Sequence, residues 1–324
     1  ARQAVGAETP LHFGDIDPSV LEGITELIVS PGVALEHPLV QFALNNNVRV
    51  MGDIDLFVAA ASAPVIGITG SNGKSTVTAL VASMLSACGK RVAVGGNFGT
   101  PALDLLDQAA DFYVLELSSF QLERAQPLNL AVATVLNLSA DHLDRHGSMP
   151  RYHHAKHKIF QGAHAVVANR ADSLTLPLLD GGTRQVLWRP TDPDLDEFGI
   201  RQLDSVPYVC CGFTPLFPVS ELKLKGLHNL NNVLAALALG VALDLPLEHL
   251  IEGLKGFSGL PHRCELVLDD AGVSWINDSK GTNVGATRAA LAGLGAQENV
   301  VLIAGGVGKG QDFTALLPEV RNHC

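Results

Sequence analysis

The stretch Gly70-Ser71-Asn72-Gly73-Lys74-Ser75-Thr76 lies between an apolar run at residues 65–69 and a helical pattern that opens at Ser75. Glycines let the backbone turn its N–H groups inward, the start of a helix adds positive potential, and Lys74 supplies a full charge. Ser75 is placed to offer its hydroxyl to Mg²⁺. Gly67 lies one position too early for the pattern G-x-x-x-x-G-K-[ST], so an ordinary glycine-rich turn is the alternative. The position between strand and helix favours a phosphate-binding loop, which by itself leaves kinases, GTPases and motor ATPases open.

Runs rich in β-branched residues continue outward from this loop. They lie at residues 65–69, 91–94, 113–117, 131–136 and 165–168. Helical patterns separate most of these runs. This alternation predicts an α/β fold with a doubly wound, mostly parallel sheet, closed by a helix after Asn229.

Smaller sections flank this central unit. The first has strands at residues 26–30 and 48–52, a helix between them and an alanine-rich linker at 59–64. The last has a hairpin of residues 265–268 and 273–277, a helix at 284–294 and a buried strand at 300–304. We therefore expect three domains, at residues 1–58, 59–258 and 259–324, with both outer domains incomplete.

The overall composition argues against several classes of protein. Of the 324 residues, 47% are apolar and 17% are charged, so the chain can bury large cores. The formal net charge of −11, without a dense Lys/Arg block, argues against nucleic-acid binding. The five cysteines form no C-x-x-C pair, which fits a reducing cytoplasm. The longest apolar run, residues 233–243, is too short to cross a bilayer, so we expect no membrane insertion.

Three further side chains are candidates for a site near the loop. Glu116 lies at the carboxyl end of a parallel strand, where it suits Mg²⁺, although a stray acidic strand end is the alternative. His142 follows the end of the next strand and is either a site residue or structural. Lys156 shares one helix face with Tyr152 and Ile159. Burial lowers the pKa of a lysine and yields an amine that reacts with CO₂, but a pairing with a carboxylate fits the spacing equally well.

Taken together, these stretches resemble the Mur ligases, most closely the branch that joins glutamate to UDP-N-acetylmuramoyl-L-alanine. The likeness runs from about residue 27 to residue 313. Its marks are SPG (30–32), GITGSNGKST (67–76), GGNFGTPAL (95–103), LELSSFQLE (115–123), DHLDRH (141–146), YHHAKHKIF (152–160), GLHNLNN (226–232), GLPHR (259–263), WINDSKGTN (275–283) and GGVGKGQDF (305–313). Two departures are Gly281, where the family usually has Ala, and Val307, where many members have Asp.

The resemblance implies an N-terminal UDP-binding domain, a central P-loop ATPase and a C-terminal glutamate-binding domain, the outer two being Rossmann-like. It implies catalytic roles for Lys74, Glu116, His142, Lys156 and Lys280, and Mg²⁺ ligation by Ser75, Glu116, His142 and a carbamylated Lys156. It implies ATP contacts by Gly70, Ser71, Asn72, Gly73, Lys74, Ser75, Thr76, Asn229, Asn232, Arg263 and Asp278. It implies substrate contacts by Ser30, Pro31, Gly32, Asn97, Ser118, Thr282 and Lys309.

The expected activity is therefore an ATP-dependent acid–amino-acid ligation with an acyl-phosphate intermediate and two Mg²⁺ ions. The amino acid implied by the resemblance is D-glutamate. Such an enzyme serves peptidoglycan precursor synthesis, and so cell-wall biogenesis, cell shape, division and the cell cycle, as a cytoplasmic monomer. The alternatives are a sister Mur ligase, a ligase like folylpolyglutamate synthase, and a nucleotide-binding paralogue without catalysis.

Overall fold

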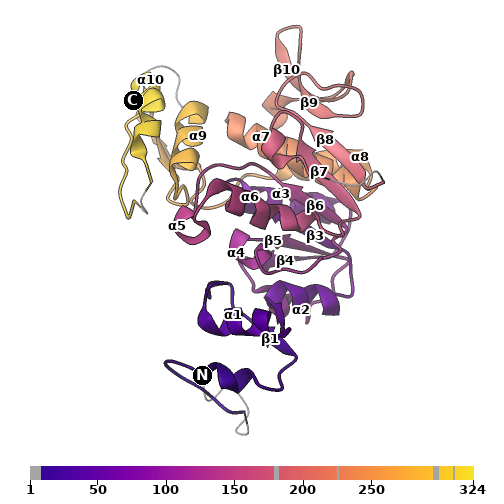
Figure 1. Ribbon diagram of the computed structural model, residues 1–324. Helices are drawn as coiled ribbons and strands as arrows, with labels where there is room; N and C mark the ends of the chain where they lie inside the picture. Colours follow the sequence, from indigo (N-terminus) through magenta and orange to yellow (C-terminus); the bar gives the residue numbers. More distant parts are fainter. Residues whose placement is uncertain (1–8, 179–181, 225, 295–298, 309–310) are drawn as a thin grey trace.

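The computed structural model of the protein describes residues 9–178, 182–224, 226–294, 299–308 and 311–324. Figure 1 shows a small N-terminal section, a large central sheet with its helices, and a third section that carries the C-terminus. The three sections follow one another along the chain. The domain boundaries themselves stay predictions.

The N-terminal section is built on two parallel strands, β1 (Glu26–Ile28) and β2 (Arg49–Met51), with Leu27 opposite Val50. Helices η1 (Pro18–Leu21) and α1 (Pro38–Asn45) cover them. Helix α2 (Asp53–Ala60) follows at once. The alanine-rich composition predicts a linker at residues 59–64 and gives no helix before it, so α2 corrects this expectation. The helix begins there because Asp55 caps it, its Oδ2 accepting from Gly52 N at 2.8 Å.

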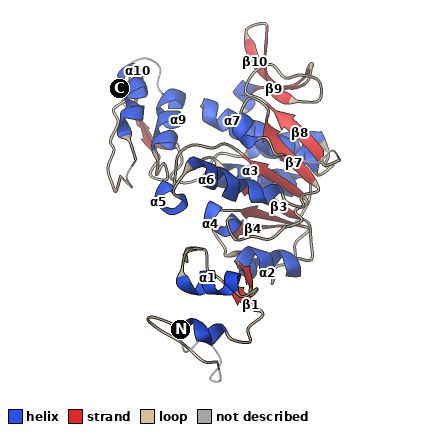
Figure 2. Ribbon diagram, viewed as in Figure 1, coloured by secondary structure: helices blue, strands red, loops and turns tan. Residues whose placement is uncertain are grey.

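The central sheet has nine strands in the order β11-β10-β9-β8-β7-β6-β3-β5-β4. All neighbouring pairs from β4 to β9 are parallel, and β9, β10 and β11 are antiparallel. The mostly parallel sheet is thus confirmed (Figure 2). The bounds are β3 (Val65–Thr69), β4 (Val92–Gly96), β5 (Phe112–Glu116), β6 (Val132–Val135), β7 (Ala165–Asn169), β8 (Arg184–Trp188), β9 (Phe198–Leu203), β10 (Val206–Cys211) and β11 (Thr214–Pro218).

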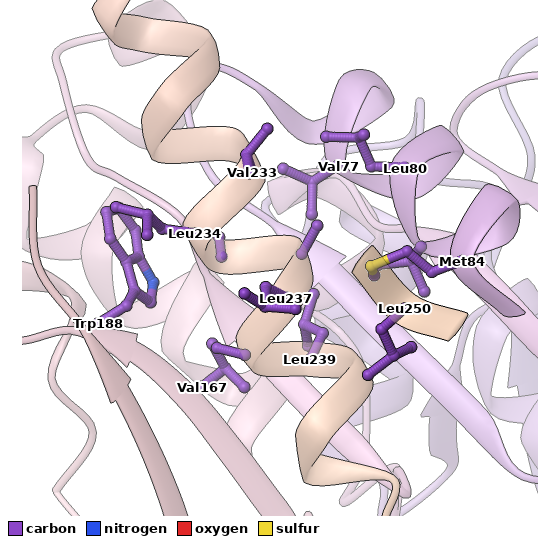
Figure 3. Packing of buried hydrophobic residues seen from close by; sticks show 14 of the residues in the cluster. Val77, Leu80, Met84, Val167, Trp188, Val233, Leu234, Leu237, Leu239 and Leu250 are labelled. Carbon is purple, nitrogen blue, oxygen red and sulfur yellow. The ribbon is translucent and has the colours of Figure 1, made fainter. Parts of the chain in front are cut away.

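Two helices, α3 (Lys74–Ala87) and α7 (Leu227–Ala242), pack on one face of this sheet, and α8 (Leu247–Gly256) packs against both of them. Figure 3 shows side chains of all three helices in one buried cluster with Val167 and Trp188 from the sheet. Burial of apolar surface stabilises this cluster by about 25 cal/mol per Å². The cluster holds α3 in place, and with it the phosphate loop at the start of α3. Within the described residues, no helix is long and apolar enough to span a membrane.

Short elements cover the opposite face and the sheet's carboxyl edge. They are η2 (Ala102–Leu105), α4 (Ser119–Leu122), α5 (Leu143–His146), α6 (Met149–His157), η3 (Lys158–Phe160) and η4 (Ser173–Thr175). The remaining turn, η5 (Val219–Glu221), lies beside β10 and packs on the first cluster. A second core forms here from α2, η3 and the strands, with Phe57 edge-on to Tyr113 at 5.1 Å between ring centroids. The helix predicted around Lys156 therefore divides into α6 and η3.

The third section holds the antiparallel hairpin β12 (Glu265–Asp270) and β13 (Val273–Asn277), then α9 (Val284–Leu294), η6 (Phe313–Leu316) and α10 (Leu317–His323). The hairpin turns on Ala271 and Gly272, whose φ values are 48° and 78°. This two-residue turn suits the twist of a hairpin and lets β12 run two residues past the predicted end.

The buried strand predicted at residues 300–304 is wrong. This segment belongs to no strand, and Val301 and Ile303 are 90% and 82% exposed. Its apolar composition indicated burial, but a strand needs a neighbour to accept its hydrogen bonds. In the part of the chain that the structure describes, this segment has no strand beside it.

Candidate functional site

The loop at the start of α3 closes around its own lysine. Lys74 Nζ donates to Gly70 O at 3.0 Å and to Ser71 O at 3.1 Å. Gly73 has φ +83°, and a Cβ there would lie 2.4 Å from Asn232 Oδ1. Burial is the main cause that lowers the pKa of Lys74. The loop therefore presents backbone N–H groups, a helix N-terminus and one buried amine to the same small space.

A buried serine–carboxylate pair lies beside this loop. Ser75 Oγ donates to Glu116 Oε2 at 2.6 Å, and Asn97 Nδ2 donates to Glu116 Oε1 at 2.7 Å. Glu116 is 3% exposed at the end of β5, next to the strand that feeds the loop. Arg263, from the third section, donates from Nη2 to Ser75 Oγ at 2.7 Å. A residue predicted at the ATP site thus reaches the loop from a section remote in sequence.

These oxygen atoms fit a magnesium ion. Mg²⁺ takes oxygen ligands and commonly combines one or two carboxylates with substrate phosphates and water. Ser75 Oγ and the Glu116 carboxylate are such ligands. The described residues contain no group of three or more His, Cys, Asp or Glu that could hold a metal by themselves. An ion here would therefore complete its coordination with ligands that the protein does not supply, such as nucleotide phosphates.

Lys156 is buried directly behind the loop, with 2% of its surface exposed. Its Nζ donates to Gly70 O at 2.9 Å and to Thr69 Oγ1 at 3.1 Å, and it lies 4.9 Å from the centroid of the Tyr152 ring. Within the described part of the chain, its hydrogen-bond acceptors are a carbonyl and a hydroxyl, not a carboxylate. Burial first, and then the charge of Lys74, lower the pKa of Lys156 well below its ordinary value.

His142 lies at the same edge of the sheet but makes different contacts. It stands at the start of α5 with a φ of 52°, and its side chain is 40% exposed. Its Nε2 is 3.7 Å from Asp141 Oδ2, and its ring meets Phe120 with 4.9 Å between centroids. Of the four predicted metal ligands, Ser75 and Glu116 touch each other, whereas His142 and Lys156 contact other groups.

A cavity of about 300 Å³ separates the loop from the third section. Its lining includes most of the residues predicted to contact ATP, together with Lys280: Asn72, Gly73, Thr76, Asn229, Asn232, Arg263, Asp278 and Lys280. Asp278 Oδ1 accepts from Cys264 N at 3.1 Å, and burial is the main cause that raises the pKa of Asp278. The cavity is therefore shared between the central and third sections.

Two asparagines in this region were missed by the sequence analysis. Asn137 binds the loop backbone twice, accepting from Asn72 N at 2.9 Å and donating from Nδ2 to Asn72 O at 3.0 Å. Asn283 Nδ2 donates to Asn72 Oδ1 at 3.0 Å and to Asp141 Oδ2 at 3.4 Å. Asn137 directly follows the strand predicted at residues 131–136, and Asn283 ends the stretch WINDSKGTN (275–283), so both positions carried a signal.

The predicted substrate residues lie in several places. Ser118 caps α4, with its Oγ accepting from Gln121 N at 3.2 Å. The loop of residues 30–32 lies against the central section through arginine side chains. Thr282 is exposed just before α9. Lys309 lies outside the described residues.

Comparison with known proteins places these features in a family. Residues 68–240 match the Mur ligase middle domain, and residues 1–52 match the MurD-like N-terminal domain of Mur ligases. The UDP-N-acetylmuramoylalanine–D-glutamate ligase of Pseudomonas putida is 52% identical over 319 residues, which cover 98% of this chain and 71% of that protein. The ligase of the same name from Acinetobacter baylyi is 50% identical and covers 96% and 71%.

Solved structures agree on the fold. The structure of a pseudomurein peptide ligase type C from Methanothermus fervidus superposes with a TM-score of 0.57 at 20% identity. The superposition covers 86% of this chain and 65% of that one. At this identity the likeness concerns the fold alone.

Proposed function

This chain belongs to the Mur ligase family, in its MurD branch, and on that premise we propose that it joins D-glutamate to UDP-N-acetylmuramoyl-L-alanine with consumption of ATP. The observation that carries the proposal is the phosphate loop, with the buried Ser75–Glu116 pair beside it and Arg263 reaching Ser75 from the third section. Phosphoryl transfer depends on positioning and charge stabilisation, which are what this arrangement supplies.

The first step transfers the γ-phosphoryl group of ATP to the carboxylate of the acceptor. The N–H groups of Ser71 and Asn72 are donated to Asn137, so the N–H groups of residues 73–76 and the amine of Lys74 hold the phosphates. Lys74 exchanges its bonds to Gly70 O and Ser71 O for phosphate oxygens. Mg²⁺, when bound at Ser75 and Glu116, supplies charge neutralisation. Arg263 adds a second positive charge from the opposite wall of the cavity. The products are ADP and an acyl phosphate.

The second step forms the amide. The amine of D-glutamate attacks the acyl carbon, the C–O bond to phosphate breaks, and the amine loses a proton as phosphate leaves. Asp278 and Lys280 line the cavity, where they are proposed to contact ATP and to act in catalysis, and Thr282, close by in the chain, is proposed to contact glutamate. Asn229 and Asn232 are proposed to contact the adenine, residues 30–32 the uracil, and Asn97, Ser118 and His142 the acceptor.

The low pKa of Lys156 supports a modification at this site. A neutral amine attacks CO₂ and loses a proton, which yields a carbamate with one negative charge. The modified side chain would replace a buried cation with an anion and suit a second Mg²⁺ ion. The cytoplasmic location, the monomeric state and the roles in cell shape and division belong to the same proposal.

The test is a ligation assay with product identification. Phosphate release is measured with ATP, UDP-N-acetylmuramoyl-L-alanine and D-glutamate, and the product is identified by mass. We expect release to require all three compounds, and L-glutamate or L-alanine to replace D-glutamate poorly. A product formed with another amino acid would indicate a sister ligase. Nucleotide binding without any product would indicate a paralogue that lacks catalysis.

A further inference from the structure

Two arginines of the central section, the buried Arg124 and the partly buried Arg145, hold the backbone of the N-terminal loop at residues 29–33. Arg124 follows α4, and none of its side chain is exposed. Its Nη1 donates to Val29 O at 3.2 Å and to Ser30 O at 2.5 Å. Its Nη2 donates to Pro31 O at 3.3 Å and to Val33 O at 2.8 Å. One guanidinium therefore binds four carbonyls of a loop more than 90 residues away in sequence.

Arg145, in α5, approaches the same loop beside Arg124. It donates to Gly32 O at 3.3 Å and to Val33 O at 2.9 Å. Glu123 joins the two arginines, because its Oε1 accepts from Arg124 Nη2 at 3.0 Å and from Arg145 Nη2. We call Glu123, Arg124 and Arg145 the carbonyl clamp. It binds every carbonyl from residue 29 to residue 33.

The two helices next to the clamp residues also hold the residues that are proposed to contact the reacting end of the acceptor. Helix α4 carries Ser118 at its start and Glu123 just after its end. Helix α5 has His142 as its N-cap and contains Arg145. His146 Nε2 lies 2.9 Å from Ser119 Oγ and so ties the two helices together. Both helices thus have a proposed acceptor contact at one end and the clamp at the other.

The arrangement also determines which groups of the loop remain available. Guanidinium groups have only donors, so they occupy the carbonyl side of the loop backbone. Val29 N donates to Met51 O and Val33 N to Ser30 O, and Pro31 has no N–H, so the N–H groups of Ser30 and Gly32 and the loop side chains are left to a ligand. Holding five consecutive carbonyls fixes the loop in one conformation before a ligand arrives. A preorganised loop binds more tightly because less conformational entropy is lost on binding.

We propose that the carbonyl clamp positions the loop of residues 29–33 to receive the uridine diphosphate end of the acceptor, at a fixed distance from Ser118 and His142. The clamp residues are positioning residues and do not touch the reacting atoms. The inference rests on the proposed function, since it takes the acceptor to be a UDP-linked sugar. The clamp would also select acceptors by length, because α4 and α5 hold the loop of residues 29–33 at a fixed distance from Ser118 and His142.

The test measures ligand affinities of the intact chain by calorimetry, so that it does not depend on turnover. The ligands are UDP, UDP-N-acetylmuramoyl-L-alanine and a non-hydrolysable ATP analogue. We expect Arg124→Met to weaken UDP and the acceptor at least about tenfold, the effect of losing one hydrogen bond to a charged group. We expect Arg124→Lys to be intermediate and Arg145→Met to be similar in direction. The affinity for the ATP analogue should stay unchanged.

Arg91→Met serves as the matched control. Arg91 also pairs with a carboxylate, with its Nη2 2.7 Å from Asp111 Oδ1, but it lies exposed on β4's side of the sheet. The clamp is refuted if the native chain binds UDP and the Arg124→Met and Arg145→Met variants bind it equally well. It is also refuted if these variants lose the ATP analogue in parallel, which indicates a general packing role. A native chain that binds neither UDP nor the acceptor overturns the proposed function, and the clamp's role with it.

Discussion

Replacing Lys156 with Met separates the chemistry of its amine from its packing. Met fills a similar buried volume without a charge or a donor. Both acceptors of the amine keep another hydrogen bond, because Gly70 O still accepts from Lys74 Nζ at 3.0 Å and Thr69 Oγ1 still donates to Leu117 O at 2.7 Å. The substitution therefore leaves no buried polar group without a partner.

The free-energy terms of this substitution oppose each other. Each lost hydrogen bond to the ammonium contributes about 1.5–3 kcal/mol, while burial of an unpaired ammonium costs several kcal/mol. We expect the free energy of unfolding of Lys156→Met to lie within about 2 kcal/mol of the native value at neutral pH. Lys156→Ala leaves a cavity as well and should cost about 2–5 kcal/mol.

The difference between Lys156→Met and the native protein should depend on pH. The pKa of Lys156 is lowered in the folded protein, so the unfolded chain binds this proton more tightly. Native stability therefore rises with pH between the lowered pKa and about 10.4, the ordinary value. The Met variant lacks this contribution, so its advantage over the native protein is largest at low pH and shrinks as pH rises.

The assay combines urea denaturation at several pH values with ligation activity. Both Lys156 variants should lose ligation, and formate should partly restore Lys156→Ala, because the proposed functional group is an anion. Lys255→Met is the control, since Lys255 lies in α8, where its Nζ is 5.0 Å from the Phe217 ring centroid and pairs with Glu221. Equal instability of Lys156→Met and Lys156→Ala would refute the reasoning. Full activity of Lys156→Met would refute the carbamate.

Other substitutions test the loop and its support. Lys74→Ala should abolish ATP-dependent phosphate release while acceptor affinity stays near native, and retained turnover would disprove the phosphate-loop assignment. Gly73→Ala should weaken ATP-analogue binding and cost about 1–2 kcal/mol of stability for its left-handed backbone, because the new Cβ would also approach Asn232 Oδ1 to 2.4 Å. Gly253→Ala should cost about 1–3 kcal/mol by overpacking, since its Cβ would lie 2.5 Å from Met84 Cα; a melting temperature equal to native would contradict this.

Local patterns determined much of the fold. The strand of residues 65–69 and the helix of residues 284–294 have the predicted bounds, because apolar periodicity and glycine positions act within a few residues of chain. The same periodicity predicted the burial of Lys156, since Tyr152 and Ile159 share its helix face. The phosphate loop could also be predicted from the sequence, because it is one contiguous segment between a strand and a helix.

Tertiary structure decided what the buried groups contact. Spacing left Lys156 open to a carboxylate partner, and only the packing of α6 behind the loop makes its acceptors Gly70 O and Thr69 Oγ1. Arg124 carried no local signal, because the carbonyls that it binds lie in another section of the chain. The segment at residues 300–304 has the composition of a strand, yet strand formation depends on a neighbour that periodicity cannot supply. Periodicity predicts which side chains are buried. Their hydrogen-bond partners lie in segments distant in sequence, which come together only when the chain folds.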